Sequence, residues 1–164
     1  MKMTGKVHNV FVQINIVHLS KLLMQAPTNG CFYMAIRLFG RVQTTELATS
    51  SFPLVFDETF VFEKLFPPVL KQTLSDMIKD EPVRLELVHV ESCGDVCRTV
   101  ARYEASVMNL LLGKEQYTKS VHERVLDIPL FQTNDNKAPF VYVRLKSSML
   151  ISESLLLSKE PFSQ

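Results

Sequence analysis

One segment of the chain, residues 52–64, constrains the fold most, because it joins a proline-marked turn to a strongly alternating strand. Alternate side chains of an extended strand point to opposite faces of a sheet. One face of this strand therefore carries Phe56, Glu58, Phe60 and Phe62. The other face carries Asp57, Thr59 and Val61. We expect Phe60 and Phe62 to anchor a hydrophobic core.

The same alternation recurs along most of the chain in short runs separated by turn residues. The turns are expected near residues 24–30, 48–53, 91–96 and 132–137. The alternating runs lie near residues 10–16, 32–38, 41–47, 54–65, 83–87, 99–107, 126–130 and 141–145. Short strands with turns between them are typical of a β-sandwich. We predict an all-β fold, an eight-stranded antiparallel sandwich, over residues 1–148.

Two segments depart from this alternation. Leu70, Leu74, Met77 and Ile78 have the spacing of one apolar helix face, and Pro68 suits a first helical position. A short inserted helix is therefore predicted over residues 68–79, covering one edge or end of the sheet. The last residues show no clear period, so residues 149–164 are expected to form a flexible tail.

Charge and composition exclude several classes of protein. The 164 residues hold 18 Lys and Arg against 17 Asp and Glu, a net charge of +1, which is too weak a field to gather nucleic acid. Polar residues interrupt the N-terminal 17 residues, so they do not form a signal peptide. Three cysteines do not make a disulfide framework. We expect a cytoplasmic chain.

The order of residues 52–64, with a proline, an acidic turn and then Phe-x-Phe, resembles the fourth strand of C2 domains. The leucine-bearing turn expected at residues 109–113 also resembles one that commonly follows their sixth strand. C2 domains bind ligands and do not catalyse reactions. The resemblance therefore implies a C2-like binding module and raises the question of calcium.

Calcium requires six to eight oxygen ligands, which clustered carboxylates supply in C2 domains. The first candidate loop, residues 20–31, offers Ser20, Gln25, Thr28 and Asn29 but no carboxylate. The second, residues 91–97, holds Glu91 and Asp95 without a closely spaced Asp-x-Asp pair. We predict that the domain does not bind calcium.

Other metal or catalytic sites are not expected either. His89, Cys93 and Cys97 could converge on a strand-loop-strand, but a fourth zinc ligand is not evident. The remaining histidines are scattered, no nucleophile elbow or phosphate loop is present, and Asp57-Glu58 is best explained as turn chemistry at the start of a strand. We predict no catalytic residues, no metal ligands and no cofactor, and hence no enzyme.

Basic residues are the remaining candidates for a ligand-binding patch. One set is Arg37, Arg41, Lys64 and Lys71, and the other is Arg144 with Lys146. Basic strand faces can attract anionic lipid without calcium. The simpler interpretation is a solvated outer face of the sheet, and we favour it.

Four blocks of sequence are more specific than a general C2 pattern. They are Arg37–Arg41, Thr44-Thr45, Phe52–Phe56 and Phe60–Pro67, with a further resemblance at residues 83–88. These blocks resemble the N-terminal domain of the spermatogenesis-associated protein 6 family. The resemblance is strong over residues 7–90 and weak after them. Members typically carry a long polar, Ser- and Arg-rich region after this domain, so functions housed in that region are not transferred.

The resemblance implies a role in assembling the connecting piece between sperm head and tail, with links to myosin, actin transport and the flagellum. Two hypotheses follow. The first is a protein-interaction module for a cytoskeletal assembly of the sperm neck or flagellum, with weak or no membrane binding. The alternative is a calcium-independent phospholipid-binding C2 domain.

Overall fold

The computed structural model describes residues 6–19, 30–49, 54–68, 71, 73–91, 96–108, 122–133 and 135–155. The strands are β1 (Lys6–Leu19), β2 (Cys31–Leu38), β3 (Arg41–Thr44), β4 (Ala48–Thr49), β5 (Leu54–Phe66), β6 (Pro82–Val90), β7 (Cys97–Ser106), β8 (His122–Gln132) and β9 (Asp135–Leu155). A short helix, α1 (Leu74–Ile78), lies between β5 and β6 along the chain.

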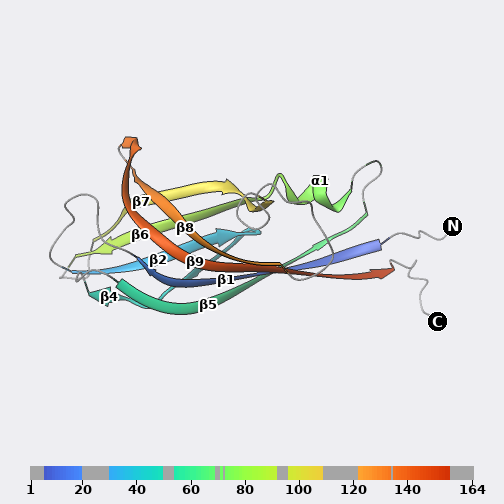
Figure 1. The fold of residues 1–164 in the computed structure, drawn as a ribbon, viewed down its shortest axis with the longest axis horizontal. Helices are drawn as coiled ribbons and strands as arrows, with labels where there is room; N and C mark the ends of the chain where they lie inside the picture. Colours follow the sequence, from blue (N-terminus) through green and yellow to red (C-terminus); the bar gives the residue numbers. More distant parts are fainter. Residues whose placement is uncertain are drawn as a thin grey trace.

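The strands pair in the order β3-β2-β6-β7-β8-β9-β1-β5, and all pairs are antiparallel. The two-residue strand β4 pairs with β2 beside this path. Pairing between β7 and β8 is brief, with only Ala101 opposite Gln132 and Arg102 opposite Phe131. The path therefore folds at that point into two layers of four strands (Figure 1). The predicted all-β sandwich is confirmed.

The core lies between the two layers and follows the predicted alternation. Inward positions of β1, β2 and β6 are almost fully buried: Val10, Val12, Ile14, Ile16, Phe32, Met34, Ile36, Leu38, Val83, Leu85 and Leu87. Phe60 is 7% exposed and Phe62 is 1% exposed, which confirms both as core residues. Val61 between them is 52% exposed, as the strand periodicity requires.

A tight turn joins β2 to β3 at Phe39 and Gly40, whose φ angles are 54° and 73°. Two consecutive positive φ values are those of a type I′ hairpin, which matches the twist of paired strands. Positive φ strains a phenylalanine but not a glycine. The Phe39 ring packs edge-on against Phe66 with centroids 5.9 Å apart, a contact that offsets part of this strain.

The third strand is shorter than predicted, and the expected turn contains a strand. β3 ends at Thr44, and β4 falls inside the segment 48–53 that was predicted to turn. Thr45 explains the break. Its N–H donates to the Met34 carbonyl, but the Met34 N–H donates to the Thr45 hydroxyl, both at 2.9 Å. Because the hydroxyl replaces the backbone carbonyl as acceptor, the regular ladder stops there.

The helix begins later than predicted, at Leu74 instead of Pro68. Lys71 has a φ of 64°, which a right-handed helix excludes. Thr73 then caps the helix, because Asp76 N–H donates to its hydroxyl and its own N–H donates to the Asp76 carboxylate, both at 3.1 Å. Leu74 and Ile78 are buried as the apolar spacing predicted. Among the described residues, no helix is long and apolar enough to cross a membrane.

Strand β9 continues beyond the domain boundary predicted at residue 148. It pairs with β1 as far as Leu155 opposite Lys6, and Met149 and Ile151 are buried in the core. Residues 149–155 are therefore strand and not tail. The inward position between Leu145 and Met149 is Ser147, which is 1% exposed. This buried polar residue interrupts the apolar alternation in the sequence. Residues 156–164 and the turn expected at 109–113 lie outside the described part of the chain.

Candidate functional site

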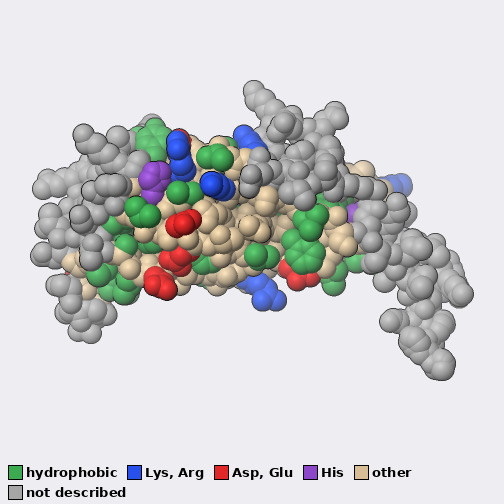
Figure 2. Space-filling view, turned by 60° about the horizontal axis from the view of Figure 1, so that its bottom comes forward, with side chains coloured by type: hydrophobic (Ala, Val, Ile, Leu, Met, Phe, Trp, Pro, Cys, Tyr) green, Lys and Arg blue, Asp and Glu red, His purple; other side chains and the backbone are tan. Residues whose placement is uncertain are grey.

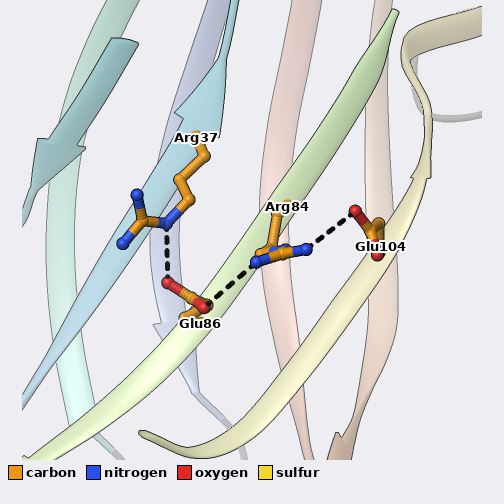
Figure 3. Close-up of polar contacts among 4 residues, drawn as sticks. All are labelled: Arg37, Arg84, Glu86 and Glu104. Carbon is orange, nitrogen blue, oxygen red and sulfur yellow. Dashed lines mark hydrogen bonds and ion pairs between the residues drawn. The ribbon is translucent and has the colours of Figure 1, made fainter. Parts of the chain in front are cut away.

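A ladder of charged side chains crosses β2, β6 and β7 (Figure 3). Arg37 Nε lies 3.0 Å from Glu86 Oε1, and Arg84 Nη1 lies 3.9 Å from Glu86 Oε2. Arg84 Nη2 continues the ladder to Glu104 Oε2 at 3.1 Å. Strand register produces it, since Arg37 is opposite Arg84 and Arg84 is opposite Glu104. Cross-strand pairs of opposite charge stabilise a sheet modestly.

Glu86 is more buried than the sequence suggested. It alternates with the buried Leu85 and Leu87 and so lies on the outer face of β6, yet only 8% of the residue is exposed, because the two arginines cover it. A buried carboxylate requires such partners. Beside the ladder lies an open hollow of about 310 Å³, whose lining includes Arg37, Phe39, Arg41, Glu81, Arg84 and Glu104. Its arginines and glutamates are mixed, so it is not a basic pocket.

Three of the predicted basic residues lie near one another, since Arg37 and Arg41 line one hollow and Arg41 and Lys64 line another, but half of the six are neutralised by carboxylates. Arg37 pairs with Glu86, Lys64 Nζ lies 2.6 Å from Glu81 Oε2, and Arg144 pairs with Asp127. Arg41, Lys71 and Lys146 form no ion pair with another described residue. Figure 2 shows acidic, basic and apolar side chains interspersed over the visible face. The structure does not assemble these six residues into one basic surface.

The pair between Arg144 and Asp127 is bidentate. Arg144 Nε and Nη2 donate to the two carboxylate oxygens at 2.9 and 2.8 Å. These hydrogen bonds hold the pKa of Asp127 below its ordinary value and raise the pKa of Arg144. Both groups therefore stay charged and paired near neutral pH.

A gap separates the two edge strands, β3 and β5, which lie at opposite ends of the pairing order. Side chains bridge it. Gln43 Nε2 donates to the Val61 carbonyl at 2.9 Å, and the Glu46 N–H donates to the Glu58 carboxylate at 3.0 and 3.3 Å. Next to these bridges is a hollow of about 400 Å³, lined by Phe11, Arg41, Gln43, Val61, Glu63, Lys64 and Leu65. No local pattern in the sequence indicates this hollow.

Exposed apolar side chains follow β5 along this edge. Val55, Val61 and Leu65 are 68%, 52% and 59% exposed. They stand on the face opposite Phe60 and Phe62, so the core cannot bury them. Exposed apolar groups on an edge strand mark a candidate pairing surface. In the sequence, this surface is indicated by apolar residues at outward positions of the alternating β5 strand.

Asp57 and Glu58 lie within β5 and do not form a turn before it. The register of β1 and β5 shifts between Ile16 and His18, and Asp57 there has a φ of 50°, so this is a β-bulge. Asn15 Nδ2 donates to Thr59 Oγ1 at 2.8 Å and approaches Asp57 Oδ1 at 3.4 Å. The acidic pair is thus held by local structural contacts.

Most of the candidate calcium and metal ligands lie outside the described residues, including 20–29 and 92–95. Cys31 and Cys97 stand opposite Val90 from the two sides of β6. His89, the residue before Val90, points to the other face of β6. It is buried there, with its ring 5.0 Å from that of Phe32. The strands therefore do not bring His89 and Cys97 to one face. Within the described ranges, no group of three His, Cys, Asp or Glu side chains is placed to hold a metal.

Comparison with known families matches this chain to one of them. A family model described as "Spermatogenesis-assoc protein 6" matches residues 10–147, which include the helix, strands β2 to β8 and most of β1 and β9. The chain belongs to the spermatogenesis-associated protein 6 family. The match extends well past residue 90, where the resemblance in the sequence weakens. The β3–β5 gap and the charged ladder both lie inside the matched region of this family member.

Solved structures similar to this family member include C2 domains. The first C2 domain of plant extended synaptotagmin 1 has a TM-score of 0.56 at 12% identity, over 87% of this chain and 93% of that one. A calcium-bound structure of two C2 domains of extended synaptotagmin 2 has a TM-score of 0.56 at 13% identity, covering 92% and 44%. CC2D1B has a TM-score of 0.58 at 11% identity, covering 84% and 53%. At such low identities, the structural similarity establishes the C2 fold and says nothing about bound ions.

Proposed function

We propose that this C2-like domain is a non-enzymatic protein-interaction module that acts in a cytoskeletal assembly of male germ cells. The sperm connecting piece and flagellum, with a myosin or another cytoskeletal protein as partner, are the assembly that the family resemblance favours. The proposed location is accordingly the cytoplasm, at the sperm neck or flagellum.

One observation carries the proposal against the lipid-binding alternative. Three of the basic residues available to an anionic membrane, Arg37, Lys64 and Arg144, already pair with carboxylates of the same domain. Each free basic residue near an acidic membrane contributes about 1 kcal/mol, so docking needs several together. Of the six predicted basic residues, this leaves Arg41, Lys71 and Lys146 without an ion pair to a described residue. Arg41 is on β3 and Lys146 is on β9, so these two lie on different strands.

The edge of β5 supports the same proposal. Exposed apolar side chains at Val55, Val61 and Leu65 suit a protein partner, because burying apolar area drives most protein association. A phospholipid headgroup surface offers no comparable apolar match to a strand edge.

Affinity capture from detergent-cleared testis extract, followed by cross-linking mass spectrometry, tests the proposal. We expect specific cross-links between the folded domain and one or a few cytoskeletal proteins. Capture with the double core variant Phe60→Ala and Phe62→Ala, whose combined destabilisation of about 6–10 kcal/mol should unfold the domain, is the control for non-specific adhesion. If the wild type and the unfolded control recover the same proteins, the proposed interaction function is wrong.

A further inference from the structure

We infer that the second half of β5, residues 61–65, is the docking edge for an extended, acidic segment of a partner protein, which adds there as a further β-strand. This inference rests on the proposed function, since it names where and how such a partner binds. Peptides that extend a sheet bind through backbone hydrogen bonds, and alternate side chains give specificity.

Backbone direction along β5 follows from one hydrogen bond. In an antiparallel strand, the N–H and C=O of one residue point to the same side, and successive residues point to opposite sides. The Val61 carbonyl accepts from Gln43 on β3, so the Val61 backbone points away from β1. Pairing with β1 is regular from Glu58 to Phe66. The backbone groups of Glu63 and Leu65 therefore also point outward, into the gap.

These outward groups have no strand beside them in the described structure. β5 pairs with β1 alone, and β3 contributes a side-chain amide instead of a ladder. The Gln43 amide itself shows that the edge accepts an amide donor, since it bonds the Val61 carbonyl at 2.9 Å. An exposed strand edge presents backbone donors and acceptors in series, and an incoming strand can pair with them.

The preceding half of β5 is closed to a partner. The Glu46 N–H bonds the Glu58 carboxylate, and β4 lies close to that half of the strand. Beyond Val61, the hollow of about 400 Å³ opens between Arg41 and Leu65. Open space and outward backbone without a neighbouring strand thus coincide over residues 61–65 of the described edge.

Side chains around the hollow define the occupant. Val61 and Leu65 are more than half exposed and offer apolar contact on one face of β5, on either side of Glu63. Arg41 lines the hollow and forms no ion pair with another described residue, whereas Lys64 pairs with Glu81 and Glu63 accepts from Asn9 Nδ2 at 2.7 Å. A fitting segment has apolar residues at every second position and a carboxylate that reaches Arg41.

Selection of a phage-displayed random 12-residue library on the full 164-residue chain tests the inference. We expect enriched peptides with alternating apolar residues and at least one Asp or Glu. Synthetic copies of these peptides should bind Leu65→Pro about tenfold more weakly, because proline removes the outward N–H without removing a bond to β1. Arg41→Glu should weaken them similarly. Val125→Ser, at an exposed position on β8 three strands away from β5 in the pairing order, is the matched control and should leave affinity unchanged.

Hydrogen exchange of the wild type provides a second readout that does not depend on a folded variant. Bound peptide should slow exchange of the Glu63 and Leu65 amides and leave those of β9 unchanged. The inference is overturned if the peptides bind Leu65→Pro as tightly as the wild type, or if Val125→Ser abolishes binding. It is also overturned if Leu65→Pro abolishes self-association of the chain but does not weaken peptide binding, because the edge would then pair with a second copy of this chain. If no peptide is enriched while cross-links to cytoskeletal proteins persist, the edge site is wrong and the proposed function stands.

Discussion

Asp127 and Arg144 form a two-point ion pair across β8 and β9, with nitrogen–oxygen distances of 2.9 and 2.8 Å, the usual range for hydrogen bonds between charged partners. The partners stand opposite each other in register, although they are 17 residues apart in sequence. Both side chains are about half exposed, at 50% and 48%, so water screens the pair. The pair therefore matters less for stability than for ligand binding, because Asp127 neutralises an arginine that would otherwise be available to an anionic ligand.

Acidification should remove the contribution of this pair to stability. The pKa of Asp127 is below its ordinary value of 3.8 because Arg144 hydrogen-bonds the carboxylate. A carboxyl with a lowered folded pKa stabilises the fold above its ordinary pKa, and the contribution is lost as pH falls towards the folded pKa. Urea unfolding between about pH 5 and about pH 2 should show a steeper loss in the wild type than in Asp127→Asn. Parallel slopes for the two proteins would contradict this account.

Truncation of the β5 core residues should be severe. Phe60→Ala and Phe62→Ala should each lower the free energy of unfolding by about 3–5 kcal/mol, through lost burial and the cavity left behind. Val61→Ala on the exposed face is the matched control and should change it by no more than about 0.5 kcal/mol. Chemical denaturation measures all three. A Phe62→Ala protein that unfolds at nearly the wild-type denaturant concentration would show that the core is elsewhere.

Gly30 and Gly40 form a natural pair for testing close packing. Both have positive φ, at 93° and 73°, so alanine strains either backbone by about 1–3 kcal/mol. A Cβ at Gly30 would also lie 2.0 Å from the Val90 carbonyl oxygen, whereas one at Gly40 would meet nothing within 4 Å. Gly30→Ala should therefore destabilise the domain clearly more than Gly40→Ala in thermal melts. Equal melting temperatures would mean that β2 and β6 do not approach as described.

Periodicity predicted most of the fold because burial on one face leaves a direct record in the sequence. It failed where polar chemistry replaced apolar burial. Ser147 hid the continuation of β9, Thr45 ended β3 with its hydroxyl, and the cap at Thr73 set the start of α1. Ser147 breaks the apolar alternation inside a buried strand, whereas Thr45 and Thr73 leave the apolar pattern around them unchanged.

The candidate site was harder to predict, since it depends on contacts between distant residues. The basic residues were visible in the sequence, but their partners were not: Arg37 meets Glu86, and Lys64 meets Glu81, through strand pairing and packing. The same holds for the β3–β5 gap. It exists because the two ends of the pairing order approach each other, which no local pattern encodes.

Calcium should not bind at cellular concentrations. Residues 20–31 contain no carboxylate, so an ion at that end of the domain would lack most of its oxygen ligands. Isothermal titration calorimetry with calcium chloride should give no binding heat above dilution. A micromolar dissociation constant would contradict this prediction and require ligands from Glu91 and Asp95.

Vesicle sedimentation tests the central claim, a protein-interaction module without stable membrane docking, most directly. The measured quantity is the fraction of the full chain that pellets with phosphatidylserine or phosphoinositide vesicles at physiological salt. The account predicts that the chain stays in the supernatant, because Arg37, Lys64 and Arg144 are neutralised. Pelleting that the double variant Arg144→Glu and Lys146→Glu abolishes would contradict it and establish the phospholipid-binding alternative.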